Sequence, residues 1–67
     1  MNIILNGKNT WIDKDIFTVA DLLSLLDIPT LGTAVALNDK VVRRNDHSST
    51  QITEGDRIEI VRAVAGG

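Results

Sequence analysis

The chain ends in Ala65-Gly66-Gly67, and this end is the feature of the sequence best suited to chemistry. Glycine has no Cβ atom, so a Gly-Gly end can enter a narrow channel and adopt backbone angles closed to other residues. The Gly67 carboxylate would then be a slender reactive group on an inert body. A free carboxylate is a poor electrophile and needs activation, for instance as an acyl-phosphate anhydride. Terminal glycines are also common at fraying chain ends, so the pattern needs support from elsewhere.

The remaining residues offer no catalytic set, so the activation must come from a partner. The chain has no cysteine, which excludes disulfides, thiolate nucleophiles and thiolate metal sites. Its one histidine, His47, has no second ligand or base nearby in the sequence, and we interpret it as a solvated loop residue. Ser48 to Thr50 are nucleophiles by type only, because no neighbouring residue would activate them. We predict that the chain is not an enzyme and binds no cofactor or metal itself.

The carboxylates are better explained as turn and helix-end charges than as a catalytic dyad, because none forms a recognisable pair. They include Asp13, Asp15, Asp21 and Asp27.

Length and composition indicate one small domain that works with protein partners. The chain has 67 residues, 43% of them hydrophobic, and a net charge of −2. Its two aromatic residues, Trp11 and Phe17, form no stacking platform, so we expect no nucleic-acid binding. No apolar run approaches the roughly 20 residues that span a bilayer, and Met1–Asn6 lacks a signal-peptide pattern. We therefore expect a cytoplasmic protein that does not bind membranes.

The first half predicts a hairpin followed by a helix. Residues 2–13 form two β-favouring runs around a turn at Gly7-Lys8. Thr18 precedes Asp21 by three residues, which resembles a capping box. Apolar residues then recur at helical spacing, so we predict a helix over residues 19–26. The apolar stripe is Val19, Leu22, Leu23 and Leu26.

The second half predicts three more strands. Residues 34–37 and 41–42 flank a turn at Asn38-Asp39. The polar segment 43–50 is interpreted as an irregular surface connection, and 54–56 as a tight hairpin turn. Residues 57–63 alternate, so they are predicted to form the last strand.

These elements predict an α+β domain in which one helix packs on one face of a mixed sheet of four to five strands. We expect the first and last strands to pair. The sheet face that packs against the helix would then carry Ile3, Leu5, Ile58 and Ile60. Val61 and Ala63 would lie on the opposite face. Val61 is either an ordinary exposed residue or part of an interaction patch that leads into the tail. We expect residues 1–63 to form the domain and 64–67 a flexible tail.

Four stretches together resemble the ThiS family, the sulfur carriers of thiamine biosynthesis, which have a ubiquitin-like β-grasp fold. They span nearly the whole chain. Many members carry Pro where Arg43 or Arg44 stands, and an aromatic residue where this chain has 45–49. We expect this difference to affect recognition of a partner rather than the fold. The matching stretches are Thr18–Leu23, Val35–Val42, Glu54–Val61 and Val64–Gly67.

The resemblance implies a mechanism at Gly67. An adenylyltransferase related to ubiquitin-activating enzymes would use ATP and magnesium to adenylate its carboxylate. A persulfide, supplied for example by a cysteine desulfurase, would displace AMP and leave a thiocarboxylate. Thiazole synthase would then take the sulfur. Gly66 would be the spacer, Val64 and Ala65 would lie in the partner's channel, and Val61 and Ala63 would contact the partner.

Four alternatives stay open at this point, one of them a carrier for another sulfur-containing metabolite. The chain could be the sulfur-carrier subunit of molybdopterin synthase, although its approach to Gly-Gly, Ile60 to Val64, favours the thiamine branch. A protein modifier that joins lysines through an isopeptide bond would use the same activated carboxylate. An interaction module with an inert tail would use none of this chemistry.

Overall fold

The first strands form a hairpin in the computed structural model, which describes residues 1–13 and 15–62. Strand β1 (Asn2–Leu5) pairs antiparallel with β2 (Lys8–Trp11), and Leu5 lies opposite Lys8. Asn6 and Gly7 have φ values of 48° and 82°, the left-handed pair that a type I′ turn requires. The predicted turn at Gly7-Lys8 is therefore one residue too late, because Asn-Gly forms the turn and Lys8 begins β2.

The helix, α1 (Val19–Leu25), has well-defined ends. The predicted capping box is present: Asp21 N donates to Thr18 Oγ1 at 3.1 Å, and Thr18 N donates to Asp21 Oδ2 at 3.0 Å. At the other end, Ile28 N donates to Leu23 O and Asp27 N to Ser24 O. This is a Schellman motif with Asp27 in the left-handed position at φ 58°.

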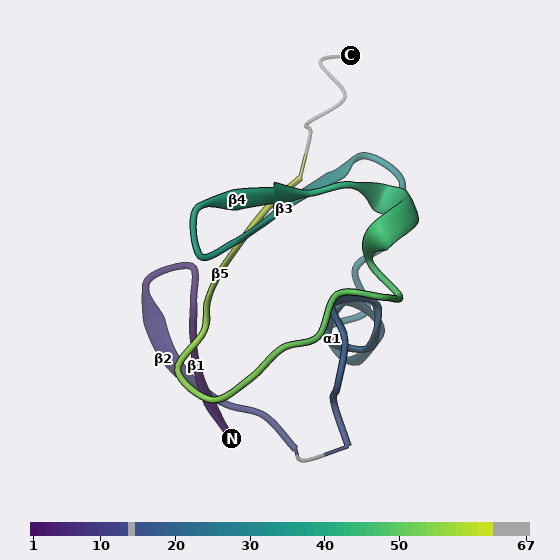
Figure 1. Ribbon diagram of the computed structural model, residues 1–67. Helices are drawn as coiled ribbons and strands as arrows, with labels where there is room; N and C mark the ends of the chain where they lie inside the picture. The colour runs from purple at the N-terminus through teal and green to yellow at the C-terminus, as the bar shows by residue number, and fades with distance from the viewer. Residues whose placement is uncertain (14, 63–67) are drawn as a thin grey trace.

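The remaining strands complete one five-stranded sheet. Strand β3 (Thr33–Leu37) pairs antiparallel with β4 (Lys40–Val42) and with β5 (Arg57–Arg62), while β5 runs parallel to β1. The order is β2-β1-β5-β3-β4, so the last strand occupies the centre. Figure 1 shows α1 to one side of this sheet. The mixed sheet, the single helix and the pairing of first and last strands were all predicted.

The core lies between the sheet and α1. Ile3 and Ile58 from neighbouring strands are fully buried, as are Leu22 and Leu23 from the helix. Leu26 was predicted to join them, but it is exposed because the helix ends at Leu25 and Leu26 is its C-cap. The buried apolar residues are Ile3, Ile12, Val19, Leu22, Leu23, Val35, Ile52, Ile58 and Ile60.

The segment after β4 corrects a second prediction. Residues Arg44–Asp46 form a short 3-10 helix, η1, and the following His47 is 3% exposed rather than solvated. Its Nε2 lies 3.2 Å from the Val42 carbonyl, and Ala20 N donates to the His47 carbonyl at 2.9 Å. The first N–H groups of α1 have no acceptor within the helix. The hydrogen bond from Ala20 N to the His47 carbonyl therefore holds this segment against the start of α1.

The predicted turn at residues 54–56 is present, but it does not close a hairpin. The chain before it forms only an isolated bridge between Gln51 and Thr18. Gly55 N instead donates to Asn2 O, and the Glu54 carboxylate accepts from Asn2 N. These hydrogen bonds therefore join the turn before β5 to the start of the neighbouring strand β1.

Candidate functional site

The candidate site is the end of β5, because this strand leads into the Gly-Gly terminus. The predicted site residues Ala63, Val64, Ala65, Gly66 and Gly67 lie outside the described residues, so their roles stay predictions. The structure describes β5, the strand that precedes them. It is the central strand of the sheet, with β1 on one side and β3 on the other.

One side of β5 is held by the side chain of Asn6. Ile60 N donates to Asn6 Oδ1 at 2.8 Å, and Asn6 Nδ2 donates to Ile60 O at 3.3 Å. The Asn6 backbone N–H also donates to Ile58 O at 2.9 Å. Because β1 ends at Leu5, the amide side chain replaces the next rung of the ladder. It holds β5 only two residues before its end at Arg62.

The first part of β5 is held in the same way from the β3–β4 turn. Arg57 N donates to Asn38 Oδ1 at 2.9 Å, and Asn38 N donates to Arg57 O at 2.7 Å. Asn38, like Asn6, is the first residue of a turn and has a positive φ of 50°. The Arg57 guanidinium also pairs with Asp39 at 2.7 Å. Two turn asparagines on opposite sides thus fix the strand that carries the tail.

The open face of the sheet is apolar near the end of β5. Val61 lies opposite Ala34, and Val41 lies opposite Ala36 on the same face. Val61 is 60% exposed and Val41 79% exposed. The exposed Val61 therefore has apolar neighbours on β3, the arrangement that an interaction patch requires.

A shallow groove of about 450 Å³ opens beside this face. The loop before β3 forms one wall, Val61 contributes from β5, and Arg44 contributes from η1. Sequence reasoning missed the groove because three separate segments build it. Arg43-Arg44, the only adjacent basic pair in the sequence, was the signal that could have pointed to it. The lining residues are Thr30, Gly32, Thr33, Ala34, Arg44 and Val61.

The Asp21 carboxylate serves the fold, because it caps the start of α1. Backbone hydrogen bonds from Phe17 and Thr18 lower the pKa of Asp21 below its usual value, so that this carboxylate caps α1 in its charged form. No group of three or more potential metal ligands occurs within residues 1–13 and 15–62. In the same ranges, no helix is long and apolar enough to cross a membrane.

The chain is similar in sequence to known sulfur carriers. The model of the ThiS family matches residues 3–67, which includes the Gly-Gly end. The sulfur carrier protein ThiS of Bacillus subtilis (strain 168) is 32% identical over 63 residues, or 94% of this chain and 96% of that protein. The sulfur carrier protein ThiS of Escherichia coli (strain K12) is 36% identical over 50 residues, or 75% and 76% of the two chains.

Solved structures agree with this similarity. The crystal structure of the thiamine biosynthesis protein (ThiS) from Geobacter metallireducens has a TM-score of 0.85 at 32% identity, and the match covers 100% of both chains. An NMR structure of a thiamine biosynthesis protein from the same organism has a TM-score of 0.84 at 32% identity. That match covers 100% of this chain and 88% of the other. The expected ubiquitin-like β-grasp fold is therefore confirmed.

Proposed function

This chain belongs to the ThiS family of sulfur carrier proteins, and on that premise we propose that sulfur is loaded at its Gly67 carboxyl group and delivered to the thiazole ring of thiamine. The observation that carries the proposal is the placement of β5. A strand held on both sides in the centre of the sheet ends at Arg62, five residues before the carboxylate. Five residues reach at most about 17 Å when extended. The carboxylate can thus enter a partner's active site while the folded domain stays outside.

The proposed reaction needs two partner enzymes and a sulfur donor. An adenylyltransferase related to ubiquitin-activating enzymes binds ATP and magnesium and transfers AMP to the Gly67 carboxylate, releasing pyrophosphate. The terminal sulfur of a persulfide then attacks the acyl adenylate and displaces AMP, which gives an acyl disulfide. A thiol cleaves the S–S bond of this acyl disulfide, leaving a thiocarboxylate at Gly67 and a new disulfide between the two thiol groups. Thiazole synthase accepts that sulfur. The chain itself contributes the acyl group and the surface by which its partners hold it, and we assign the reaction to the cytoplasm.

Within this reaction the tail residues have separate proposed roles. Gly67 carries the reacting carbon and Gly66 lets the backbone pass a narrow channel, since neither has a Cβ atom. Val64 and Ala65 are proposed to line the partner's channel with small apolar side chains. Val61, which is exposed beside Ala34, is proposed to contact the partner's surface, with Ala63 alongside.

Mass spectrometry of the intact chain tests this proposal directly. The chain is co-expressed with the adenylyltransferase and the persulfide donor, and a matched variant lacking Gly67 serves as control. We expect one oxygen to be replaced by sulfur in the full chain and no change in the control. Conjugates on lysines instead would indicate a protein modifier. A stable complex with a molybdopterin synthase subunit would indicate the other carrier class, and an unchanged mass would contradict the proposal.

A further inference from the structure

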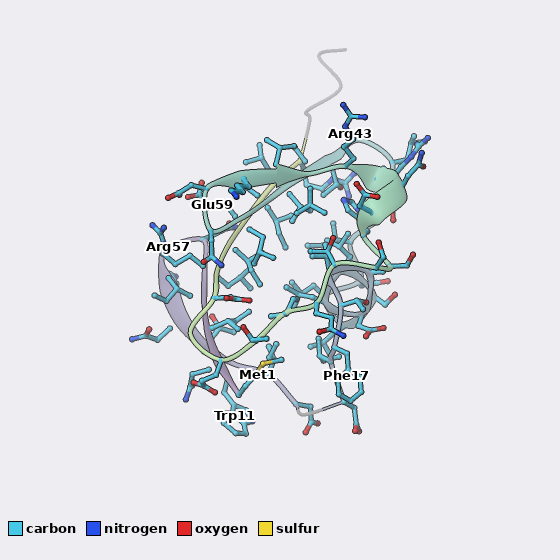
Figure 2. All side chains as sticks on the ribbon, viewed as in Figure 1. Met1, Trp11, Phe17, Arg43, Arg57 and Glu59 are labelled. Atoms are coloured by element: carbon cyan, nitrogen blue, oxygen red, sulfur yellow. The ribbon has the colours of Figure 1, made fainter. Side chains whose placement is uncertain are left out.

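Three arginines gather at the end of the molecule where β5 ends. Arg62 is the last residue of β5 and lies opposite Thr33, and Arg43 and Arg44 follow β4 on the other side of β3. All three are exposed. Figure 2 shows Arg43 at this end, while Met1, Trp11 and Phe17 lie at the other. Three of the seven Lys and Arg residues therefore lie near the end of β5, although the whole chain carries a net charge of −2.

None of these arginines forms an ion pair within residues 1–13 and 15–62. Of the cations in the described ranges, Arg57 alone forms an ion pair, and its partner Asp39 lies in the β3–β4 turn, away from this end. Arg44 instead lines the groove, where Val61 and Ala34 supply apolar surface. A guanidinium at the rim of an apolar groove suits a carboxylate that flanks an apolar side chain.

We propose that this groove is the docking point of the adenylating partner, and that it takes an apolar side chain of that partner flanked by carboxylates. The inference rests on the proposed function and names the chemistry of the partner's surface. The apolar side chain contacts Val61 and Ala34, and the carboxylates pair with Arg44, which lines the groove, and with the adjacent Arg43. The groove begins at Val61, six residues before Gly67, so docking there aligns the tail with the active site. Opposite charge also speeds the encounter of the two proteins.

Steady-state kinetics of adenylation test the docking point. The measurement uses the full chain, its cognate adenylyltransferase, ATP and magnesium, with pyrophosphate release as the readout. We expect Arg44→Glu to raise the KM for the chain roughly tenfold or more with kcat little changed, because the substitution acts on docking rather than on the reacting carboxylate. Arg44→Lys should retain most of the affinity. Lys8→Glu, the same charge change on β2 at the far edge of the sheet, should stay within about twofold of wild type.

Salt provides a second measurement that does not depend on any variant's folding. Because exposed charges are screened over about 10 Å at 0.1 M ionic strength, the wild-type KM should rise with added NaCl. A KM that is independent of salt, or equal KM values for Arg44→Glu and Lys8→Glu, would overturn the inference and leave the proposed function intact. A wild-type chain that is never adenylated would overturn both.

The chain's own tail is the competing occupant, since its terminal carboxylate is also an anion. Backbone amide NMR spectra of the isolated chain, with and without Gly67, separate the two occupants. We expect the amides of Gly32 and Thr33 to keep their chemical shifts when Gly67 is removed, and to shift when the adenylyltransferase is added without ATP. Shifts on removal of Gly67 alone would assign the groove to the tail and contradict partner docking.

Discussion

Asn6 and Ile60 form a paired contact in which one side-chain amide satisfies both polar groups of a backbone unit on the neighbouring strand. Asn6 Oδ1 accepts from Ile60 N at 2.8 Å while its Nδ2 donates to Ile60 O at 3.3 Å. The two residues are 54 positions apart in the sequence. The contact therefore joins the first turn to the strand that leads to Gly67, and it replaces a ladder rung that β1 is too short to make.

Replacing Asn6 with glycine should destabilise the fold by about 1–2 kcal/mol, because two hydrogen bonds to a partly buried strand are lost. Glycine keeps the positive φ of 48° without strain, so the change isolates the side-chain contact. Urea unfolding measures the loss, and hydrogen exchange at the Ile60 amide should become faster. Asn6→Asp keeps the acceptor but places a carboxylate oxygen against the Ile60 carbonyl, so its effect should be at least as large. Unchanged exchange at Ile60 would contradict the role assigned to Asn6.

Asp27→Gly should stabilise the protein by about 0.5–1 kcal/mol. Asp27 occupies the left-handed position of the Schellman motif at φ 58°, where glycine has no steric cost, and its negative charge lies at the unfavourable end of the helix dipole. Asp39→Gly is the matched comparison, since Asp39 also has a positive φ of 71° but pairs with Arg57. Its gain should be smaller. Thermal unfolding of both variants would contradict the argument if Asp39→Gly were the more stable.

The sequence predicted the elements that rest on local patterns. Thr18 and Asp21 have the spacing of a capping box, so nearby residues predict where the helix begins. Ile58 and Ile60 alternate with exposed residues, so nearby residues also predict which side of the strand is buried. Asn6-Gly7 was also a local signal, since this dipeptide is typical of a type I′ turn, but it was assigned one residue late.

The contacts that sequence reasoning missed are those that depend on distant partners. His47 lies in a polar stretch without periodicity, and its burial follows only from the docking of residues 47–52 on the start of α1. The groove likewise needs Arg44 and Val61, which are brought together by the pairing of β3 with both β4 and β5. Such contacts require the three-dimensional arrangement of the sheet before they can be seen.

Stability should fall in acid as Asp21 becomes protonated. Backbone hydrogen bonds from Phe17 and Thr18 lower the folded-state pKa of Asp21 below the ordinary 3.8. A depressed carboxyl pKa contributes stability that is present above the unfolded pKa and lost as pH falls through the folded pKa. Unfolding free energies measured from pH 7 down to pH 2 should therefore decrease below about pH 4, and Asp21→Asn should reduce the size of that decrease.

Thr18→Ala is the control for this acid dependence. It removes the hydroxyl that accepts from Asp21 N and should cost about 1 kcal/mol at every pH. The carboxylate of Asp21 still accepts from Phe17 N and Thr18 N. The decrease of the unfolding free energy with falling pH should therefore stay close to that of wild type. If the unfolding free energy of Asp21→Asn also fell in acid as much as that of wild type, the titration of other groups would cause the acid sensitivity.

His47 should support the fold without taking part in sulfur transfer. It is 3% exposed, and its Nε2 lies 3.2 Å from the Val42 carbonyl at the end of β4. His47→Ala removes a buried ring and leaves that carbonyl without this partner, so we expect a loss of about 2–3 kcal/mol in the free energy of unfolding. The same change at exposed Ser48, Ser48→Ala, should stay within about 0.5 kcal/mol of wild type. At a temperature where the His47→Ala variant is still folded, its kcat for adenylation should match that of wild type. A fall in kcat without a loss of stability would instead assign His47 to the reaction.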